Sequence, residues 1–217
     1  MRNRFSHLLV MLLAGPATAI AVEGDWGYAH NLYATLSLTE KWSVLHRSQF
    51  ALRDDMSDFF FGFADIGIGY RIHPDWRLDA VYRRAWIEPA GTWLIEDRPL
   101  VNLTWFGTMH DARISNRSRI EFRKYRWDRK DDIRYRNETR VDLPWEILPF
   151  GIKPYVEEEF FWGRNSGKVE MNWLTGGLYC KPNNSTKLKL GYRWVSARVG
   201  DEWENRNQLV TSFNFFF

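Results

Sequence analysis

Hydrophobic and polar residues alternate along most of this chain. From Leu32 onward, runs of about ten residues repeat a period-two pattern, which predicts successive β-strands. The clearest run covers residues 186–196, in which Leu188, Leu190 and Tyr192 share one face and basic residues occupy the other. Elsewhere the polar face is densely charged. This charge is too dense for a soluble core and too regular for a loop.

Turn signals divide the pattern into eleven candidate runs, which start near residues 30, 42, 59, 76, 97, 112, 132, 150, 169, 186 and 205. Short links (39–41, 73–75, 181–184) roughly alternate with longer ones (53–55, 88–91, 127–131, 163–168, 199–204). This alternation is typical of outer-membrane barrels. We therefore predict an all-β fold: a closed antiparallel transmembrane β-barrel of about 10–12 strands, connected as an up-and-down meander.

An odd strand count conflicts with the even number expected of bacterial single-chain barrels. With the C-terminus in the periplasm, strict alternation also places the start of the first run outside the cell. Three explanations remain open at this point. One run is not a strand, the segment before Tyr33 threads the lumen, or the first and last strands pair in parallel.

The N-terminus has the features of a cleaved secretory signal. Arg2 and Arg4 precede the apolar run 8–14, and the small-residue pattern of residues 17–21 follows. The apolar run is far shorter than the roughly 20 residues of a membrane-spanning helix, which disfavours an N-terminal anchor. We expect residues 1–21 to be a signal peptide and residues 22–217 to form the barrel domain. No later segment resembles a helical membrane span.

The C-terminus supports insertion into a lipid bilayer. One face of the last run carries Leu209, Thr211, Phe213, Phe215 and Phe217, and the other face is mostly polar. Backbone amides in hydrocarbon must be bonded within the protein, so a spanning sheet must close and its last strand is paired. This aromatic ending resembles the insertion signal that the bacterial barrel-assembly machinery recognises in outer-membrane proteins.

Tryptophan positions agree with a spanning barrel. The chain has 12 Trp, many near the ends of the predicted strands. Because indole prefers the boundary between hydrocarbon and water, we predict an aromatic girdle. Its members are Trp42, Trp76, Trp86, Trp105, Trp127, Trp162 and Trp194. Tryptophan residues in a soluble β core would explain their number but not this placement.

Composition limits the chemistry. The formal net charge of +3 includes Arg2 and Arg4, and no basic block suggests a nucleic-acid partner. Cys180 is the single cysteine, and the histidines lack metal-ligand spacing, so we expect no disulfide, metal or cofactor. The expected partners are outer-membrane lipid and, during insertion, the assembly machinery. The sequence does not indicate the oligomeric state.

The charged faces predict a lumenal ion-pair network. Its proposed members are Arg113, Arg117, Arg119, Glu121, Arg123, Arg134, Arg136, Glu138, Arg140, Glu157, Glu159 and Arg193. A hairpin centred near residues 128 and 129 would pair residues whose numbers sum to about 257. This register sets Glu121 opposite Arg136 and Arg119 opposite Glu138.

Several functions fit this architecture. The network either rigidifies a structural barrel or lines a narrow channel for small, possibly anionic, solutes, since arginine rings select anions. A lipid-modifying hydrolase is an alternative, with His46 as base and Ser48 as nucleophile, but no acid near them in sequence obviously orients the imidazole and no G-x-S-x-G elbow is present. We therefore expect no enzyme. A soluble periplasmic ligand-binding barrel would require the inverse arrangement, with an apolar interior.

Short motifs along the mature chain resemble a known family, the domain-of-unknown-function 2490 family of predicted bacterial outer-membrane β-barrels. The matching pieces are residues 32–38 with Lys41 and Trp42, and residues 67–71, 116–121, 134–136 and 154–160. The resemblance implies an exported barrel in the outer membrane of a Gram-negative bacterium. The family has no established activity, so the resemblance implies no substrate or catalytic residue.

Overall fold

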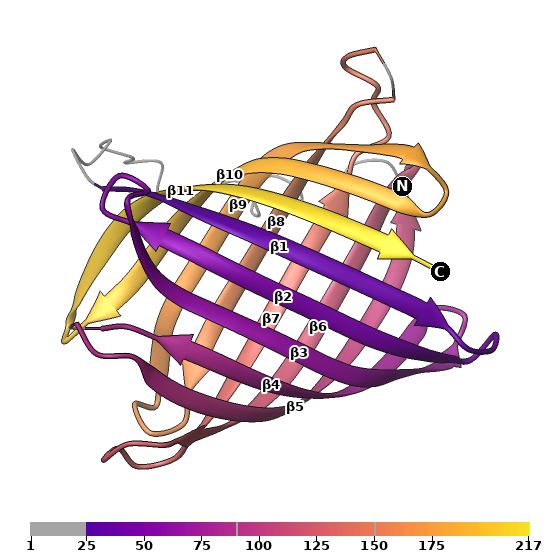
Figure 1. Cartoon of the computed structure of the whole chain (residues 1–217). Helices are drawn as coiled ribbons and strands as arrows, with labels where there is room; N and C mark the ends of the chain where they lie inside the picture. The colour runs from indigo at the N-terminus through magenta and orange to yellow at the C-terminus, as the bar shows by residue number, and fades with distance from the viewer. Residues whose placement is uncertain (1–24, 90, 150) are drawn as a thin grey trace, which may run out of the picture.

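The computed structural model describes residues 25–89, 91–149 and 151–217, which form one closed barrel (Figure 1). The predicted signal peptide at residues 1–21 lies outside the described residues. Eleven strands make the wall: β1 (Trp26–Ser37), β2 (Trp42–Arg53), β3 (Asp58–His73), β4 (Trp76–Ile87), β5 (Leu94–Met109), β6 (Ala112–Tyr125), β7 (Asp132–Asp142), β8 (Lys153–Gly163), β9 (Lys168–Asn183), β10 (Thr186–Val199) and β11 (Glu202–Phe216). The predicted fold class and strand number are confirmed. No helix in the described part of the chain is long and apolar enough to span a bilayer.

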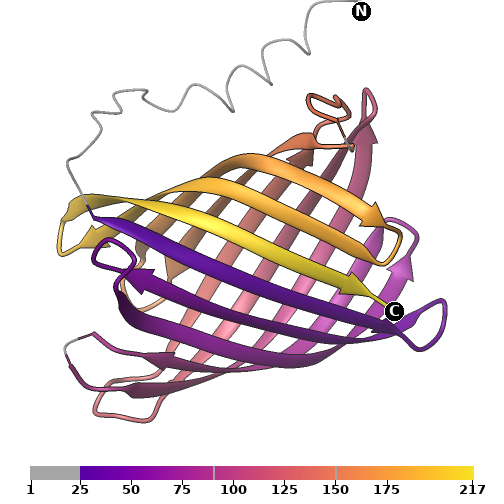
Figure 2. The same ribbon diagram turned by 45° about the horizontal axis from the view of Figure 1, so that its top comes forward.

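The barrel closes through a parallel pair of strands, β1 and β11, which lie side by side in Figures 1 and 2. Their register runs from Trp26 opposite Asn207 to Thr35 opposite Phe216, and every other neighbouring pair is antiparallel. An odd number of strands that alternate in direction can close only with its first and last strands parallel. Of the three explanations for the odd count, the parallel closure is therefore correct.

The lengths of the connections follow the sequence prediction only in part. The turns at residues 74–75, 110–111 and 184–185 are short and lie at the C-terminal end of the barrel. The longest connection, residues 143–152 between β7 and β8, lies at that same end, so the rough alternation of short and longer links does not hold there. Pro144 and Pro149 interrupt the alternation in this segment. They do not indicate at which end of the barrel this connection lies.

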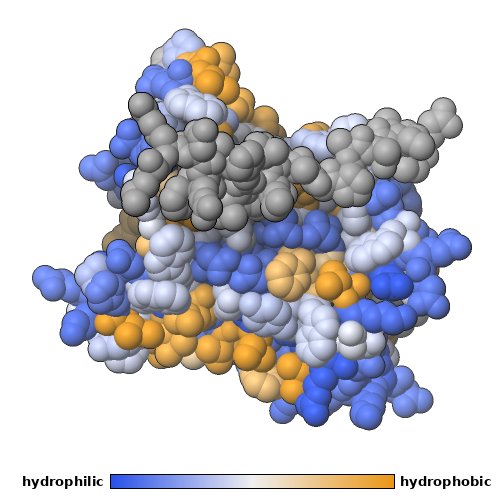
Figure 3. All heavy atoms as spheres, turned by 180° about the vertical axis from the view of Figure 1, so that it is seen from behind, coloured by the Kyte–Doolittle hydropathy of each residue, from blue (hydrophilic) through white to orange (hydrophobic). Residues whose placement is uncertain are grey.

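The two faces of the wall differ in chemistry. Outward side chains are apolar and accessible, such as Ile66 at 65% and Leu190 at 56% exposure, whereas the inward Glu96 and Glu121 are fully buried. The side seen in Figure 3 shows this apolar surface in orange, interrupted by hydrophilic patches. A charged interior inside an apolar exterior is the arrangement of a transmembrane barrel and the inverse of a soluble lipid-binding barrel.

Part of the outward face of β6 and β7 is polar, and its groups bond to one another. The Asn116 and Asn137 side chains exchange amide hydrogen bonds of 2.9 and 3.1 Å. Asn116 also donates to the Thr139 hydroxyl, and the Ser118 and Tyr135 hydroxyls lie 3.0 Å apart. Polar side chains facing lipid are costly unless satisfied, and here they satisfy one another across the two strands.

Candidate functional site

The inner wall of the lumen carries a layer of ion pairs around Glu121. The carboxylate of Glu121 contacts Arg134 at 2.6 Å, Arg136 at 3.0 Å and Arg119 at 3.3 Å. The layer extends to β8 through Glu159, which accepts from Arg136 at 2.7 Å and from Arg117 at 3.3 Å. Arg117 also pairs with Glu138. Charges from three adjacent strands, β6, β7 and β8, therefore neutralise one another on the inner wall.

Further ion pairs flank this layer on both sides. Toward the end away from the C-terminus, Glu96 accepts from Arg98 at 2.5 Å and from Arg123 at 2.7 Å. Asp65 holds Arg83 in a two-bond pair of 2.6 and 2.7 Å. Paired guanidinium and carboxylate groups in such a fixed fork are more rigid than single bonds.

Toward the C-terminal end the pairs involve lysines as well as arginines. Asp142 contacts Arg140 at 2.6 Å and Lys187 at 2.7 Å. Glu157 contacts Lys189 at 3.1 Å and Arg193 at 3.7 Å. Lys187 and Lys189 on β10 complete the charge network at this end. Alternation along β10 places both lysines on the same face as Arg193.

The structure brings most of the sequence-predicted lumenal residues together. All of them except Arg113 form ion pairs in the network described above, while Arg113 is exposed near the start of β6. The predicted cross-strand register is wrong by two residues. Glu121 lies opposite Arg134 and Arg119 opposite Arg136, so the numbers sum to 255 instead of 257. A shift of two preserves the face of every side chain, so the residues stay in the lumen but change partners.

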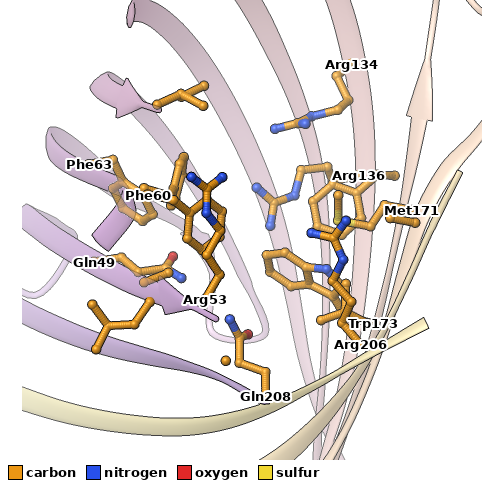
Figure 4. A pocket seen from close by; sticks show the side chains of 18 of the residues that line it. Gln49, Arg53, Phe60, Phe63, Arg134, Arg136, Met171, Trp173, Arg206 and Gln208 are labelled. Carbon is orange, nitrogen blue, oxygen red and sulfur yellow. The ribbon is translucent and has the colours of Figure 1, made fainter. Parts of the chain in front are cut away.

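Above the ion-pair layer, at the end away from the C-terminus, the lumen opens into a vestibule of about 270 Å³. Its arginines are Arg47, Arg53, Arg83, Arg98, Arg123, Arg134, Arg136 and Arg206, and Asp25 is the one acidic residue in its lining. Figure 4 shows Arg134 and Arg136 on one side of this space and Arg53, Phe60 and Phe63 on the other. This vestibule is the candidate functional site.

Aromatic rings in the vestibule hold the guanidinium groups in place. The Arg83 guanidinium lies 3.5 Å from the centroid of Phe63, and that of Arg136 lies 4.1 Å from the centroid of Phe161. Such contacts orient a cation without neutralising it. These rings were not predicted from the sequence, because only charged residues were assigned to the lumen. Phe161 lies two residues after Glu159 on β8 and therefore on the same face.

Arg47 differs from the other vestibule arginines. Its Nη2 donates to Asn31 Oδ1 at 3.1 Å, but its Nε and Nη1 are buried and have no hydrogen-bond partner among the described residues. The guanidinium lies 4.7 Å from the ring of Tyr33 and 5.1 Å from that of Phe63. Buried donors are normally satisfied, so an unsatisfied arginine at a cavity wall points to a missing acceptor.

The predicted aromatic girdle residues lie at several heights on the wall. Trp42 and Trp76 begin β2 and β4 and are exposed, and Trp86 and Trp162 are exposed near the other end of the barrel. The remaining three (Trp105, Trp127 and Trp194) are half-buried. Trp127 lies in the β6–β7 connection, where its ring packs 4.8 Å from that of Tyr125.

The C-terminal residues complete the parallel junction. The Phe217 amide donates to the Thr35 carbonyl at 2.9 Å, and the Ser37 amide donates to the Phe217 carbonyl at 2.8 Å. Phe213 is exposed on the outward face and Leu209, Thr211 and Phe215 are partly covered on it, while Ser212 is buried on the inward face. The role of these residues as an insertion signal stays a prediction.

The possible catalytic pair lies outside the lumen. His46 and Ser48 are both on the outward face of β2, and His46 Nδ1 lies 2.9 Å from the backbone oxygen of Asp65. No hydrogen bond joins the two side chains in the described structure. The described residues also include no group of three or more His, Cys, Asp or Glu side chains arranged to hold a metal ion.

Comparisons with known proteins agree with this architecture. The family model "Protein of unknown function (DUF2490)" matches residues 26–207. The chain belongs to the DUF2490 family. Among solved structures, this DUF2490 protein is similar to the NanC porin, with a TM-score of 0.56 and 12% identity, over 88% of this chain and 98% of that one. At this identity the likeness shows the porin-like barrel fold alone. The comparison with curated proteins found no match.

Proposed function

We propose that this DUF2490 protein is an outer-membrane channel that takes small anionic solutes into the arginine-lined vestibule. Arg47 carries this proposal, because it lines the vestibule and two of its buried N–H groups have no acceptor among the described residues, which an anion at this wall would supply. A volume of about 270 Å³ favours a small solute over a polymer.

The other vestibule arginines also favour an anionic solute. Arg83, Arg123 and Arg136 are each bonded to a buried carboxylate that lies behind the lining. Their charges are partly compensated, so they contribute a positive field and a rigid wall. Arginine-lined constrictions favour anions for this reason.

The ion-pair layer around Glu121 forms the narrow part of the proposed pathway. Passage past it requires that some of the pairs separate, which makes conduction slow or voltage-dependent. Solute capture in the vestibule and passage through the layer are therefore separate steps, and they can be measured separately.

The test is ion selectivity in planar lipid bilayers. With a salt gradient across the bilayer, the mature protein is expected to show a reversal potential on the anion-selective side, and Arg47→Gln should move it toward zero. Arg126→Gln is a matched control, since Arg126 lies outside the lumen and is bonded to Asp97. A cation-selective wild type, or an Arg47→Gln variant indistinguishable from wild type, contradicts the proposal.

A second candidate function is a closed structural barrel. The complete burial of Glu121 and Glu96 favours it, because fully paired charges can replace an apolar core. Absence of conductance at any voltage, together with no binding of small anions, would select this function over the channel.

A further inference from the structure

A second cavity lies at the rim of the barrel wall away from the C-terminus. Residues at the end of β6, the start of β7 and the β8–β9 turn border this crevice, which has a volume of about 560 Å³. Its walls are fixed by backbone contacts: the Arg164 amide donates to the Ile133 carbonyl at 2.8 Å, and the Asn165 side chain donates to the Asp131 carbonyl at 3.1 Å. The crevice adjoins the vestibule at Arg123, which lines both, and its other lining residues are different.

Besides Arg123, which is paired with Glu96 at 2.7 Å, three basic side chains among the described residues line the crevice: Lys124, Lys130 and Arg164. All three are exposed, and none lies within 4.0 Å of a carboxylate oxygen of the described residues. Unpaired cations gathered at one cavity favour an anionic ligand.

The two acidic residues at the crevice are already engaged by the protein. Asp131 accepts from the Tyr125 amide at 3.2 Å. Asp132 accepts from the amides of Ile133 at 2.8 Å and Asn165 at 3.1 Å. These carboxylates accept hydrogen bonds that hold the connections in shape, so they compete little with an anionic ligand for the three basic side chains.

The neighbouring outer surface adds to the positive charge. Asp97 lies opposite Lys124 on the adjacent strand, but its carboxylate is bonded to Arg84 at 2.9 Å and Arg126 at 2.5 Å. One carboxylate thus faces two arginines. Asp97 therefore does not act as a counter-ion for Lys124, its neighbour in the ladder. The rim has more positive than negative charge.

Directly next to the cations the crevice is apolar. Phe122 lies opposite Ile133 in the β6–β7 ladder, and both line the crevice on the outward side of the wall. The Phe122 side chain is 43% exposed. A ligand that fills this crevice therefore meets cations at the rim and an apolar surface continuous with the lipid-facing wall.

We propose that this crevice binds the phosphorylated head group of a membrane lipid. The phosphate lies among Lys124, Lys130 and Arg164, and the acyl chains run along the outer wall from Phe122 and Ile133. Phosphate oxygens match ammonium and guanidinium donors, and a soluble anion would leave the apolar part of the crevice unused.

Native mass spectrometry of the detergent-solubilised mature protein tests this proposal, with diphosphorylated lipid A as the probe. The triple variant K124Q/K130Q/R164Q should bind lipid A about 100-fold more weakly, since each basic side chain near a lipid phosphate contributes about fivefold in affinity. The matched control K41Q/R71Q/K181Q loses the same charge from exposed positions at the opposite end and should bind as wild type does.

Two further measurements keep the result decisive. Lys130→Gln alone alters a connection residue, so it keeps the barrel folded and should weaken lipid A binding by about fivefold even if the triple variant fails to fold. Inorganic pyrophosphate should compete weakly with lipid A. Lipid A binding unchanged in Lys130→Gln, or pyrophosphate binding as tightly as lipid A, overturns the proposal of a lipid site.

Discussion

Replacing Glu121 by Gln removes the negative charge at the centre of the ion-pair layer with little change in volume. Arg136 keeps Glu159 at 2.7 Å, and Arg119 keeps the Asn102 oxygen at 2.7 Å. Arg134 has no second carboxylate partner within 4.0 Å in the described structure. The substitution therefore leaves two buried cations, Arg119 and Arg134, without a carboxylate counter-ion among the described residues, and Arg119 alone keeps a hydrogen bond to another residue.

The expected cost follows from these unpaired charges, above all that of Arg134, whose hydrogen bonds both go to Glu121. Removing one partner of a buried ion pair typically destabilises a protein by about 3–5 kcal/mol. We expect the free energy of unfolding of Glu121→Gln to fall by about this amount. It can be measured by urea titration of the barrel folded in lipid vesicles, followed by tryptophan fluorescence.

Two comparisons make the reasoning refutable. Glu204→Gln breaks an ion pair with Arg206 whose side chains are about half exposed, and it should cost at most about 1 kcal/mol. Adding Arg134→Gln to Glu121→Gln removes one of the two unpaired charges and should restore at least about 1 kcal/mol relative to the sum of the single changes. A Glu121→Gln barrel as stable as the Glu204→Gln barrel would refute the account of the closed layer.

Three further predictions concern the wall. Gly177→Val should lower stability by about 1–3 kcal/mol in the same titration, because a Cβ there lies 2.3 Å from the Leu190 carbonyl oxygen. Gly176→Val, whose Cβ meets nothing within 4 Å, should change it little. Thr211→Val removes the hydroxyl that bonds Tyr28 at 2.6 Å beside the parallel junction and should cost about 1 kcal/mol, with unchanged stability as the contrary result. Deleting Phe217 should reduce the yield of folded barrel in cells, measured by heat-modifiable migration, and an unchanged yield would speak against its role as an insertion signal.

The period-two pattern was sufficient to predict the barrel and the face of most side chains. Arg119, Glu121 and Arg136 lie inside because alternation puts them there, whatever their cross-strand partners. The partners themselves depend on where the β6–β7 hairpin turns. The residues of that turn carry no alternation, so the sequence did not reveal the register.

Local irregularities in the strands hid the rest of the site. The register of β2 and β3 shifts where Ala51 pairs with Phe61 and Leu52 with Phe59, so Phe60 has no partner and departs from the alternation. This bulge brings Phe60 into the vestibule lining. Whether the Nε and Nη1 donors of Arg47 find acceptors depends on strands that are distant in the sequence. No local pattern indicates that they lack them.

The central claim is that the charged stripe faces a closed interior and the apolar stripe faces lipid. A nitroxide scan along β6 tests it most directly, using single cysteines in a Cys180→Ser background in lipid vesicles and measuring collision with oxygen and with a water-soluble nickel complex. Labels at the positions of Ile114, Ile120 and Phe122 should collide with oxygen, and a label at the position of Arg119, which is buried and lines neither cavity, should be protected from both reagents. Strong nickel collision at position 119 together with protection at positions 114, 120 and 122 would contradict the account.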